Sequence, residues 1–138
     1  SAFIDAERRQ VDACAEAGFD VCEVHTGPWS AAFAVCGGDM RRPELRMEME
    51  RVARAGHGIV KAGMRFNAGH GLNYHNVVPI AAMPIVEELH IGHAIVSRAV
   101  YVGLRRAVGE MKRLLLRSGD GGFVSEEEGL ICGMGSPE

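Results

Sequence analysis

The sequence predicts an α/β fold of four strand–helix units that form part of a (β/α)8 barrel. Short apolar strands alternate with amphipathic segments along the 138 residues, which indicates a parallel sheet with helices packed outside it. Polar side chains follow the successive strands, as they do at the active face of such a barrel. A complete barrel needs about 250 residues, so the chain supplies about half of one.

The first unit begins at the N-terminus. Residues 2–4 have strand character, and the strand ends at Asp5. Residues 6–17 are predicted to be an amphipathic helix that stops at Gly18, because apolar or small residues recur at helical spacing: Val11, Cys14, Ala15 and Gly18. Asp5 stands where it could cap this helix, a role that we favour over membership of a site.

The second unit starts with a strand over residues 21–25, which Thr26, Gly27 and Pro28 end. Residues 29–42 are predicted to be a loop. Pro43 suits the first turn of a helix, and this helix is expected to close at Gly56 and Gly58. Its apolar face is formed by Leu45, Met49, Val52, Ala53 and Gly56.

In the third unit a buried strand ends at Phe66, residues 67–76 form a loop, and residues 77–83 form a short helix before Pro84. The fourth strand covers residues 88–91. A long helix over residues 97–117 follows, with an apolar stripe of Val100, Leu104, Ala107, Val108, Met111 and Leu115. We expect the acidic, glycine-rich residues 118–138 to be a disordered tail outside the domain of residues 1–117.

Composition limits the possible partners. The net charge of −3 and the pI of about 6.1 provide no basic stripe for nucleic acid, and no apolar run reaches the length of a membrane span. We therefore expect a cytoplasmic protein with small or anionic ligands. Because the chain starts with Ser1 almost inside a strand, we also expect it to be a piece of a longer protein.

The four cysteines show no metal-binding or redox spacing. Cys14, Cys22, Cys36 and Cys132 contain no Cys-x-x-Cys pair, and two of them fall on apolar faces. Free buried thiols are therefore predicted, rather than disulfides or zinc ligands.

The strongest local signal is the stretch of residues 67–76, which contains Gly69-His70-Gly71. A histidine between two glycines after a strand can point outward, and the backbone can approach a ligand closely. The stretch could also be only a tight turn. The functional interpretation gains weight because right-handed crossovers gather the loops after all four strands at one end of the sheet. The ends of the four strands carry the polar or loop residues Asp5, Glu23 with His25, Asn67 with His70, and Gly92 with His93.

Three alternatives stay open at this point. A doubly wound open sheet is the second choice of fold, although no Gly-x-Gly-x-x-Gly turn follows the first strand. Asp5, Glu23, His70 and His93 could together bind a divalent metal in a hydrolase, but no His-x-His or His-Glu-x-x-His spacing supports this. We favour a structural role over a catalytic one for His25.

Five segments in compatible order resemble pyridoxine 5'-phosphate synthase. They are Phe-Ile-Asp-Ala at 3–6, Glu-Val-His-Thr-Gly at 23–27, Asn-Ala-Gly-His-Gly-Leu-Asn-Tyr at 67–74, Ile-Gly-His-Ala-Ile at 91–95 and Ala-Val-Gly-Glu-Met-Lys-Arg-Leu at 107–114. The resemblance covers residues 2–117 and implies strands five to eight of a (β/α)8 barrel.

The resemblance also implies an activity. That family condenses 1-deoxy-D-xylulose 5-phosphate with 3-amino-2-oxopropyl phosphate into pyridoxine 5'-phosphate, with loss of phosphate and water and with neither an organic cofactor nor a metal. It implies that His70 donates a proton, that Gly71 binds substrate, that Gly92 and His93 hold a substrate phosphate, and that Glu23 stabilises the transition state. A homo-oligomer is expected once the barrel is complete.

Two departures from the family pattern matter. The family's other acid–base residues, a histidine and a glutamate, belong to the first half of the barrel and have no counterpart in this chain. His90 stands where the family usually has asparagine. The second functional hypothesis is therefore a catalytically incomplete, phosphate-binding half barrel, either a fragment or a remnant.

Overall fold

A computed structural model describes residues 1–119, and in this part of the chain the strands form one parallel sheet of order β1-β2-β3-β4. The predicted four-stranded parallel sheet is thereby confirmed. The tail predicted for residues 118–138 lies, from residue 120 on, outside the described residues. In chain order the elements are β1 (Ala2–Ile4), α1 (Arg8–Glu16), β2 (Val21–His25), α2 (Gly27–Val35), α3 (Pro43–Lys61), β3 (Arg65–Gly69), α4 (Val77–Ala81), β4 (Glu88–His90), α5 (His93–Val102) and α6 (Leu104–Gly119).

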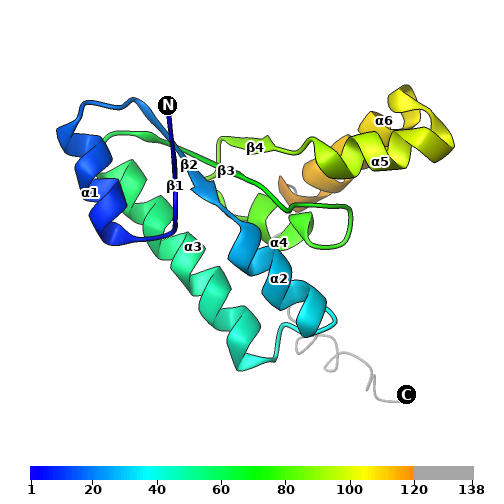
Figure 1. Ribbon diagram of the computed structural model, residues 1–138, viewed down its shortest axis with the longest axis horizontal. Helices are drawn as coiled ribbons and strands as arrows, with labels where there is room; N and C mark the ends of the chain where they lie inside the picture. Colours follow the sequence, from blue (N-terminus) through cyan, green and yellow to red (C-terminus); the bar gives the residue numbers. More distant parts are fainter. Residues whose placement is uncertain (120–138) are drawn as a thin grey trace, which may run out of the picture.

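The helices cover one face of the sheet. Side chains alternate along each strand, and Cys22 and Val24 of β2, with Phe66 and Ala68 of β3, are fully buried on the helix side. In Figure 1 helices α2, α3 and α4 lie below the strands and α1 lies to their left. On the opposite face Phe3 is 57% exposed. This second face, which a parallel sheet normally buries, is not covered by any helix of residues 1–119.

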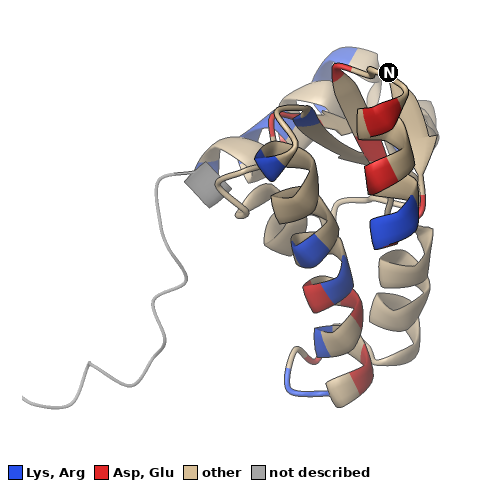
Figure 2. Ribbon diagram, turned by 90° about the vertical axis from the view of Figure 1, so that its left-hand side faces the viewer, with Lys and Arg blue, Asp and Glu red and all other residues tan. Residues whose placement is uncertain are grey.

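Helix α2 corrects the prediction of a loop over residues 29–42. Pro28 occupies the first turn of the helix, where its missing N–H is no loss, so Gly27-Pro28 both ends the strand and starts a helix. Trp29 is completely buried, and its ring packs on Phe33 at a centroid distance of 5.5 Å. Figure 2 shows this helix without charged residues, whereas α3 carries both signs along its length.

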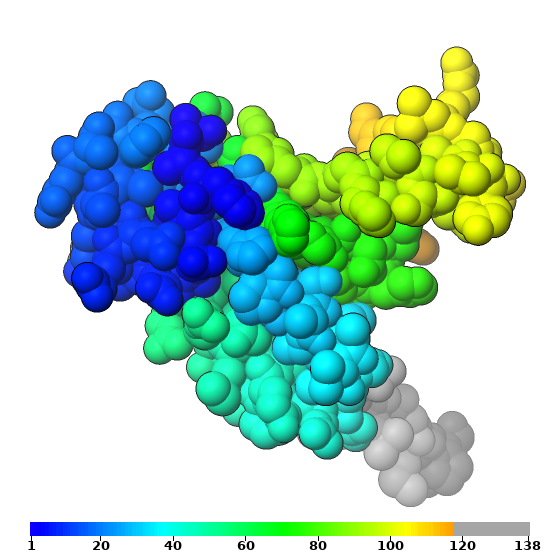
Figure 3. Space-filling model, in the orientation of Figure 1, coloured from blue at the N-terminus to red at the C-terminus, as the bar shows by residue number. Residues whose placement is uncertain are grey.

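The predicted long helix over residues 97–117 is wrong, because the chain forms two helices with Gly103 between them. Gly103 has φ of +82°, a conformation that ends helices and that glycine adopts without strain. The break divides the predicted apolar stripe. Ala107 and Met111 are buried, but Val100 and Leu104 are exposed. The α5–α6 pair projects from the body at the right of Figure 3.

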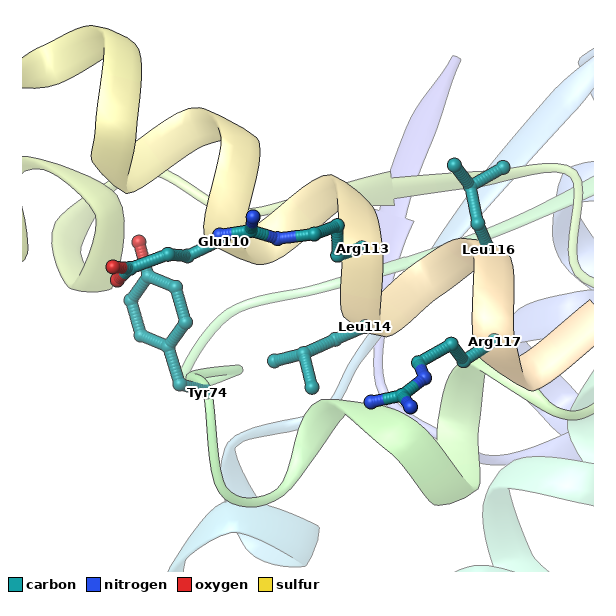
Figure 4. Close-up of a pocket in the computed structure, with 6 residues that line it drawn as sticks. All are labelled: Tyr74, Glu110, Arg113, Leu114, Leu116 and Arg117. Carbon is teal, nitrogen blue, oxygen red and sulfur yellow. The ribbon is translucent and has the colours of Figure 1, made fainter.

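A carboxylate on α6 joins the two helices of this pair. Glu110 accepts hydrogen bonds from Nε of Arg98 on α5 and from Nε of Arg106 on α6, each at 2.9 Å. These two guanidinium groups lower the pKa of Glu110 to about 2. Figure 4 shows Glu110 and Tyr74 at one end of a pocket along α6. None of the residues predicted to form the site lies in this pocket.

Smaller differences concern the ends of elements. Strand β3 runs to Gly69, not Phe66, and α3 runs to Lys61, past both of its glycines. The prediction that Asp5 caps the first helix is wrong, because the residue before α1 is Glu7 and no side chain caps the helix. Within residues 1–119, no helix is both long and apolar enough to cross a membrane.

The cysteine prediction is confirmed where the structure describes it. Cys14 and Cys22 are free and buried, and Cys36 is free and partly buried. Burial raises the pKa of the Cys22 thiol to about 11, with a further contribution from the nearby Cys14. Cys132 lies outside the described residues.

Two glycines of α3 are expected to respond oppositely to alanine. A Cβ at Gly56 would lie 2.5 Å from Cε1 of the buried Phe66 ring, whereas at Gly58 it would make an ordinary contact, 3.6 Å from Val11. We expect Gly56→Ala to lower the free energy of unfolding by about 1–3 kcal/mol through overpacking. Gly58→Ala should raise it by about 0.5–1 kcal/mol through helix propensity. Thermal unfolding monitored by circular dichroism distinguishes the two, and equal shifts would contradict this packing of α3 on β3.

Candidate active site

All five predicted site residues line one cleft of about 700 Å³ at the carboxyl ends of β2, β3 and β4. Right-handed βα connections bring the ends of parallel strands to one edge of the sheet, which explains why residues far apart in the sequence meet there. The predicted residues in the cleft are Glu23, His70, Gly71, Gly92 and His93.

The backbone at His70 has an unusual conformation. His70 directly follows β3 and has φ of +74°, the only positive φ at a non-glycine residue in the described chain. Such conformations cost about 1–3 kcal/mol and collect at functional sites. The buried Thr26 hydroxyl lies 2.6 Å from the carbonyl oxygen of Gly69 and 2.7 Å from that of His70. Its single proton is shared between the two oxygens and holds the turn.

A second set of hydrogen bonds holds Gly71. Its carbonyl oxygen accepts from the Ser30 hydroxyl at 2.7 Å and from Nδ2 of Asn76 at 3.1 Å. Asn76 is itself buried, and its own carbonyl accepts from Nε1 of Trp29 at 3.1 Å. Ser30 of α2 and Asn76, which directly precedes α4, therefore fix the Gly-His-Gly turn.

The His70 ring packs on other aromatic rings. The His25 ring meets it nearly edge-on, with centroids 4.7 Å apart, and Phe3 lies 6.4 Å from it. Nδ1 of His25 is 3.3 Å from Oδ1 of Asp5. The pKa of Asp5 is lowered, first by a hydrogen bond from Gln10 and then by one from His25. This arrangement orients His25 and, through ring contact, His70.

Glu23 reaches across β3 toward β4. Its Oε2 is 2.6 Å from Nδ1 of His90, and its Oε1 lies over Gly69, where a Cβ would overlap it. Gly69 therefore has no side chain where the Glu23 side chain passes. The hydrogen bond between Glu23 of β2 and His90 of β4 thus passes over Gly69 of β3, and both side chains line the cleft. We call this interaction the bridge over Gly69.

Gly92 precedes α5, the first helix after β4. No side chain caps the start of this helix, so its first N–H groups are available to a ligand at the cleft. A Cβ added at Gly92 would meet open space. A helix N-terminus with an uncovered glycine is suited to binding an anion.

Comparison with known proteins identifies the family. The sequence profile described as "Pyridoxal phosphate biosynthesis protein PdxJ" matches residues 1–117. The chain belongs to the PdxJ family. It is 56% identical over 121 residues to pyridoxine 5'-phosphate synthase of Azoarcus sp. (strain BH72), an alignment that covers 88% of this chain and 49% of the relative.

Other PdxJ relatives show similar coverage. Pyridoxine 5'-phosphate synthase of Aromatoleum aromaticum is 59% identical over 83% of this chain and 46% of the relative. That of Rhodopirellula baltica is 49% identical over 83% of this chain and 44% of the relative. The chain spans about half the length of the curated relatives that it matches.

The metal alternative gains no support from the geometry of this PdxJ chain. Among residues 1–119, no three His, Cys, Asp or Glu side chains are placed to hold a metal ion together. In the suggested set, Asp5 pairs with His25 and Glu23 with His90, and Asp5 does not line the cleft.

Sequence reasoning missed the groups that support the PdxJ motifs. The sequence pattern marks Thr26 only as the end of a strand and Ser30 as part of a loop, but both hold the His70 turn. His90 was noted only as a departure from the family pattern, but it contacts Glu23 directly. The sequence does indicate that His90 lies near a carboxylate, because it is two residues after Glu88 and therefore on the same face of β4.

Proposed function

We propose that residues 1–117 form the C-terminal half of a (β/α)8 barrel that synthesises pyridoxine 5'-phosphate. The substrates would be 1-deoxy-D-xylulose 5-phosphate and 3-amino-2-oxopropyl phosphate, with release of phosphate and water. The observation that carries this proposal is the convergence of the family's motif residues on one cleft at the carboxyl edge of the sheet.

Three features support closure into a barrel. The sheet has two open edges, β1 and β4, and open edges of parallel sheets are normally paired or covered. One face carries polar side chains from β2, β3 and β4, as the inside of a barrel mouth does. Val96, Val100, Tyr101 and Leu104 on the α5–α6 pair are more than half exposed. Four further strand–helix units would pair the edges and bury these side chains.

His70 is the proposed general acid. A histidine titrates near neutral pH and can give a proton to a leaving oxygen during dehydration and ring closure. Its strained backbone, held by Thr26, and its edge contact with His25 keep the ring at the cleft. A fixed ring position matters because proton transfer requires hydrogen-bond reach to the substrate.

The phosphate subsite is proposed at Gly92 and His93, with Gly71 as a further backbone contact. The uncapped N–H groups of α5 and the positive end of its dipole attract an anion, and His93 adds an imidazole at the same rim. Gly71 has φ of +76° and lies in the turn next to His70, so one substrate can contact both residues.

Glu23 is proposed to stabilise the positive charge that develops on an imine-like intermediate. A carboxylate held in place before reaction is effective because no reorganisation is needed as the charge forms. The bridge to His90 over Gly69 holds it in this way. The proposed reaction uses no organic cofactor and no metal, and we place the complete homo-oligomeric enzyme in the cytoplasm.

The second candidate function is a half barrel that binds phosphate without catalysis. It is favoured by the uncapped start of α5 at the cleft, which can hold an anion without any acid–base group. Under this alternative the subsite at α5 is intact, but no product forms even when a first half is supplied.

A growth assay distinguishes the two functions. The first half of the Azoarcus relative is fused to residues 1–117 and expressed in a bacterial strain that lacks its own pyridoxine 5'-phosphate synthase. We expect growth without added pyridoxine, and none when the same fusion carries His70→Ala. Failure of the folded fusion to support growth would favour the binding half barrel.

A further inference from the structure

We propose that His90 is a positioning residue that holds the Glu23 carboxylate across β3 and makes the action of this carboxylate depend on pH. This inference rests on the proposed function of the cleft. The family resemblance places asparagine, not histidine, at this position, so the role assigned here is specific to this chain.

The strand register brings the two side chains together. His25, Gly69 and His90 are aligned on β2, β3 and β4, and Glu23 lies two residues before His25 on the same face. With glycine at 69, the Glu23 side chain passes over the middle strand and meets Nδ1 of His90 at 2.6 Å. A short contact of this kind is typical of a charge-assisted hydrogen bond.

A second carboxylate lies on the other side of the His90 ring. Nε2 of His90 is 3.6 Å from Oε2 of Glu88, and the same oxygen accepts a hydrogen bond from Nδ2 of Asn67 at 3.2 Å. Arg65 approaches the other oxygen of Glu88 at 4.0 Å. The charged and titratable groups that face His90 are thus Glu23 from β2, Glu88 from β4, and Arg65 through Glu88. His70 and His93 line the same cleft.

This environment favours the protonated ring. The pKa of His90 is raised above its usual value of 6.5, chiefly by the hydrogen bond to Glu23; burial opposes this shift, and the charges of Glu23 and Glu88 add to it. Below this raised pKa, an imidazolium donates to Glu23. As the pH rises through it, the ring loses its charge and the carboxylate is held less firmly. Asparagine at this position can donate an N–H to Glu23 but cannot titrate.

The pairing is tested in the chain itself by NMR titration of the histidine rings. The His90 signal is assigned by its absence from His90→Asn. We expect His90 to titrate above its usual pKa, and Glu23→Gln to move this midpoint down. The exposed His57, whose ring hydrogen-bonds to the backbone carbonyl of Ala53, is the internal reference, because it lies far along the chain from Glu23 and outside the cleft. The same His90 midpoint in both proteins would overturn the pairing, whether or not the barrel is an enzyme.

The positioning role is tested in the barrel completed by the first half of the Azoarcus relative. His90→Ala should lower kcat by about 10-fold or more with little change in KM, since a displaced catalytic group slows the reaction. In the unmodified barrel we expect kcat to decline on the alkaline side, and His90→Asn should recover most of kcat near pH 6 but show no such decline. His57→Gln is the matched control and should change neither value.

An unchanged kcat in the folded His90→Ala barrel, or the same alkaline decline in His90→Asn, would overturn the positioning role. If the unmodified barrel forms no product, the proposed function fails, and the NMR titration still decides the pairing of His90 with Glu23.

Discussion

Replacing His70 by alanine is expected to lower the rate of pyridoxine 5'-phosphate formation by about 10²- to 10⁴-fold, the usual contribution of a positioned general acid. The measurement is product formation by the complete barrel, followed by its absorbance or fluorescence. Alanine removes the proton donor but relieves no backbone strain, since residue 70 keeps its positive φ in the turn that Thr26 holds. Substrate phosphate binding should persist, because Gly92 and His93 belong to a different segment.

His75 provides the matched control for this prediction. It lies five residues after His70, is exposed, and does not line the cleft. His75→Ala should leave turnover within about twofold of the unmodified barrel, as surface substitutions usually do. Near-normal turnover in His70→Ala would defeat the assignment of His70 as the general acid.

Alanine at Gly69 is expected to lower kcat by about 10²- to 10³-fold, the cost of losing one electrostatic group that acts in the transition state. Its Cβ would overlap Oε1 of Glu23 and lie 3.0 Å from Cβ of His90. Glu23 would then leave its position over β3. Gly109→Ala in α6 is the control, since a Cβ there meets open space and φ is not positive.

A double mutant tests whether the effect of Gly69→Ala acts through Glu23. If both changes remove the same interaction, Gly69→Ala combined with Glu23→Gln should be no slower than Glu23→Gln alone. Thermal unfolding is measured in parallel so that loss of folded protein is not counted as loss of kcat. Additive effects of the two changes on kcat would contradict the bridge over Gly69.

The repeating pattern of the sequence was sufficient to predict the sheet. Four apolar strands, each followed by a turn and a helical segment, allow only a parallel arrangement with short connections, and chirality then places the polar strand ends together. Glu23, His70 and Gly92 could therefore be assigned to one cleft without coordinates. The residue types themselves, a histidine between glycines and a glycine before a helix, indicated which chemistry to expect.

What the sequence left open depends on long-range contacts and on glycine. The helix break at Gly103 depends on one residue with positive φ, and a continuous apolar pattern on both sides concealed it. The hydrogen bond from Glu23 to His90 joins residues that are 67 positions apart and lie on either side of β3. The periodicity of a single strand does not tell how neighbouring strands are aligned, so the sequence could not predict this pair. Thr26 was missed because its role is to bind a turn that begins 43 residues later.

The most direct test is the formation of pyridoxine 5'-phosphate by three samples: the isolated chain, the first half of the Azoarcus relative, and an equimolar mixture of the two. Because the catalytic cleft is proposed to need acid–base groups from both halves, we predict product only in the mixture. Turnover by the isolated chain would contradict the need for a second half. No product from halves shown to fold and associate would contradict the assignment of this chain to a working synthase.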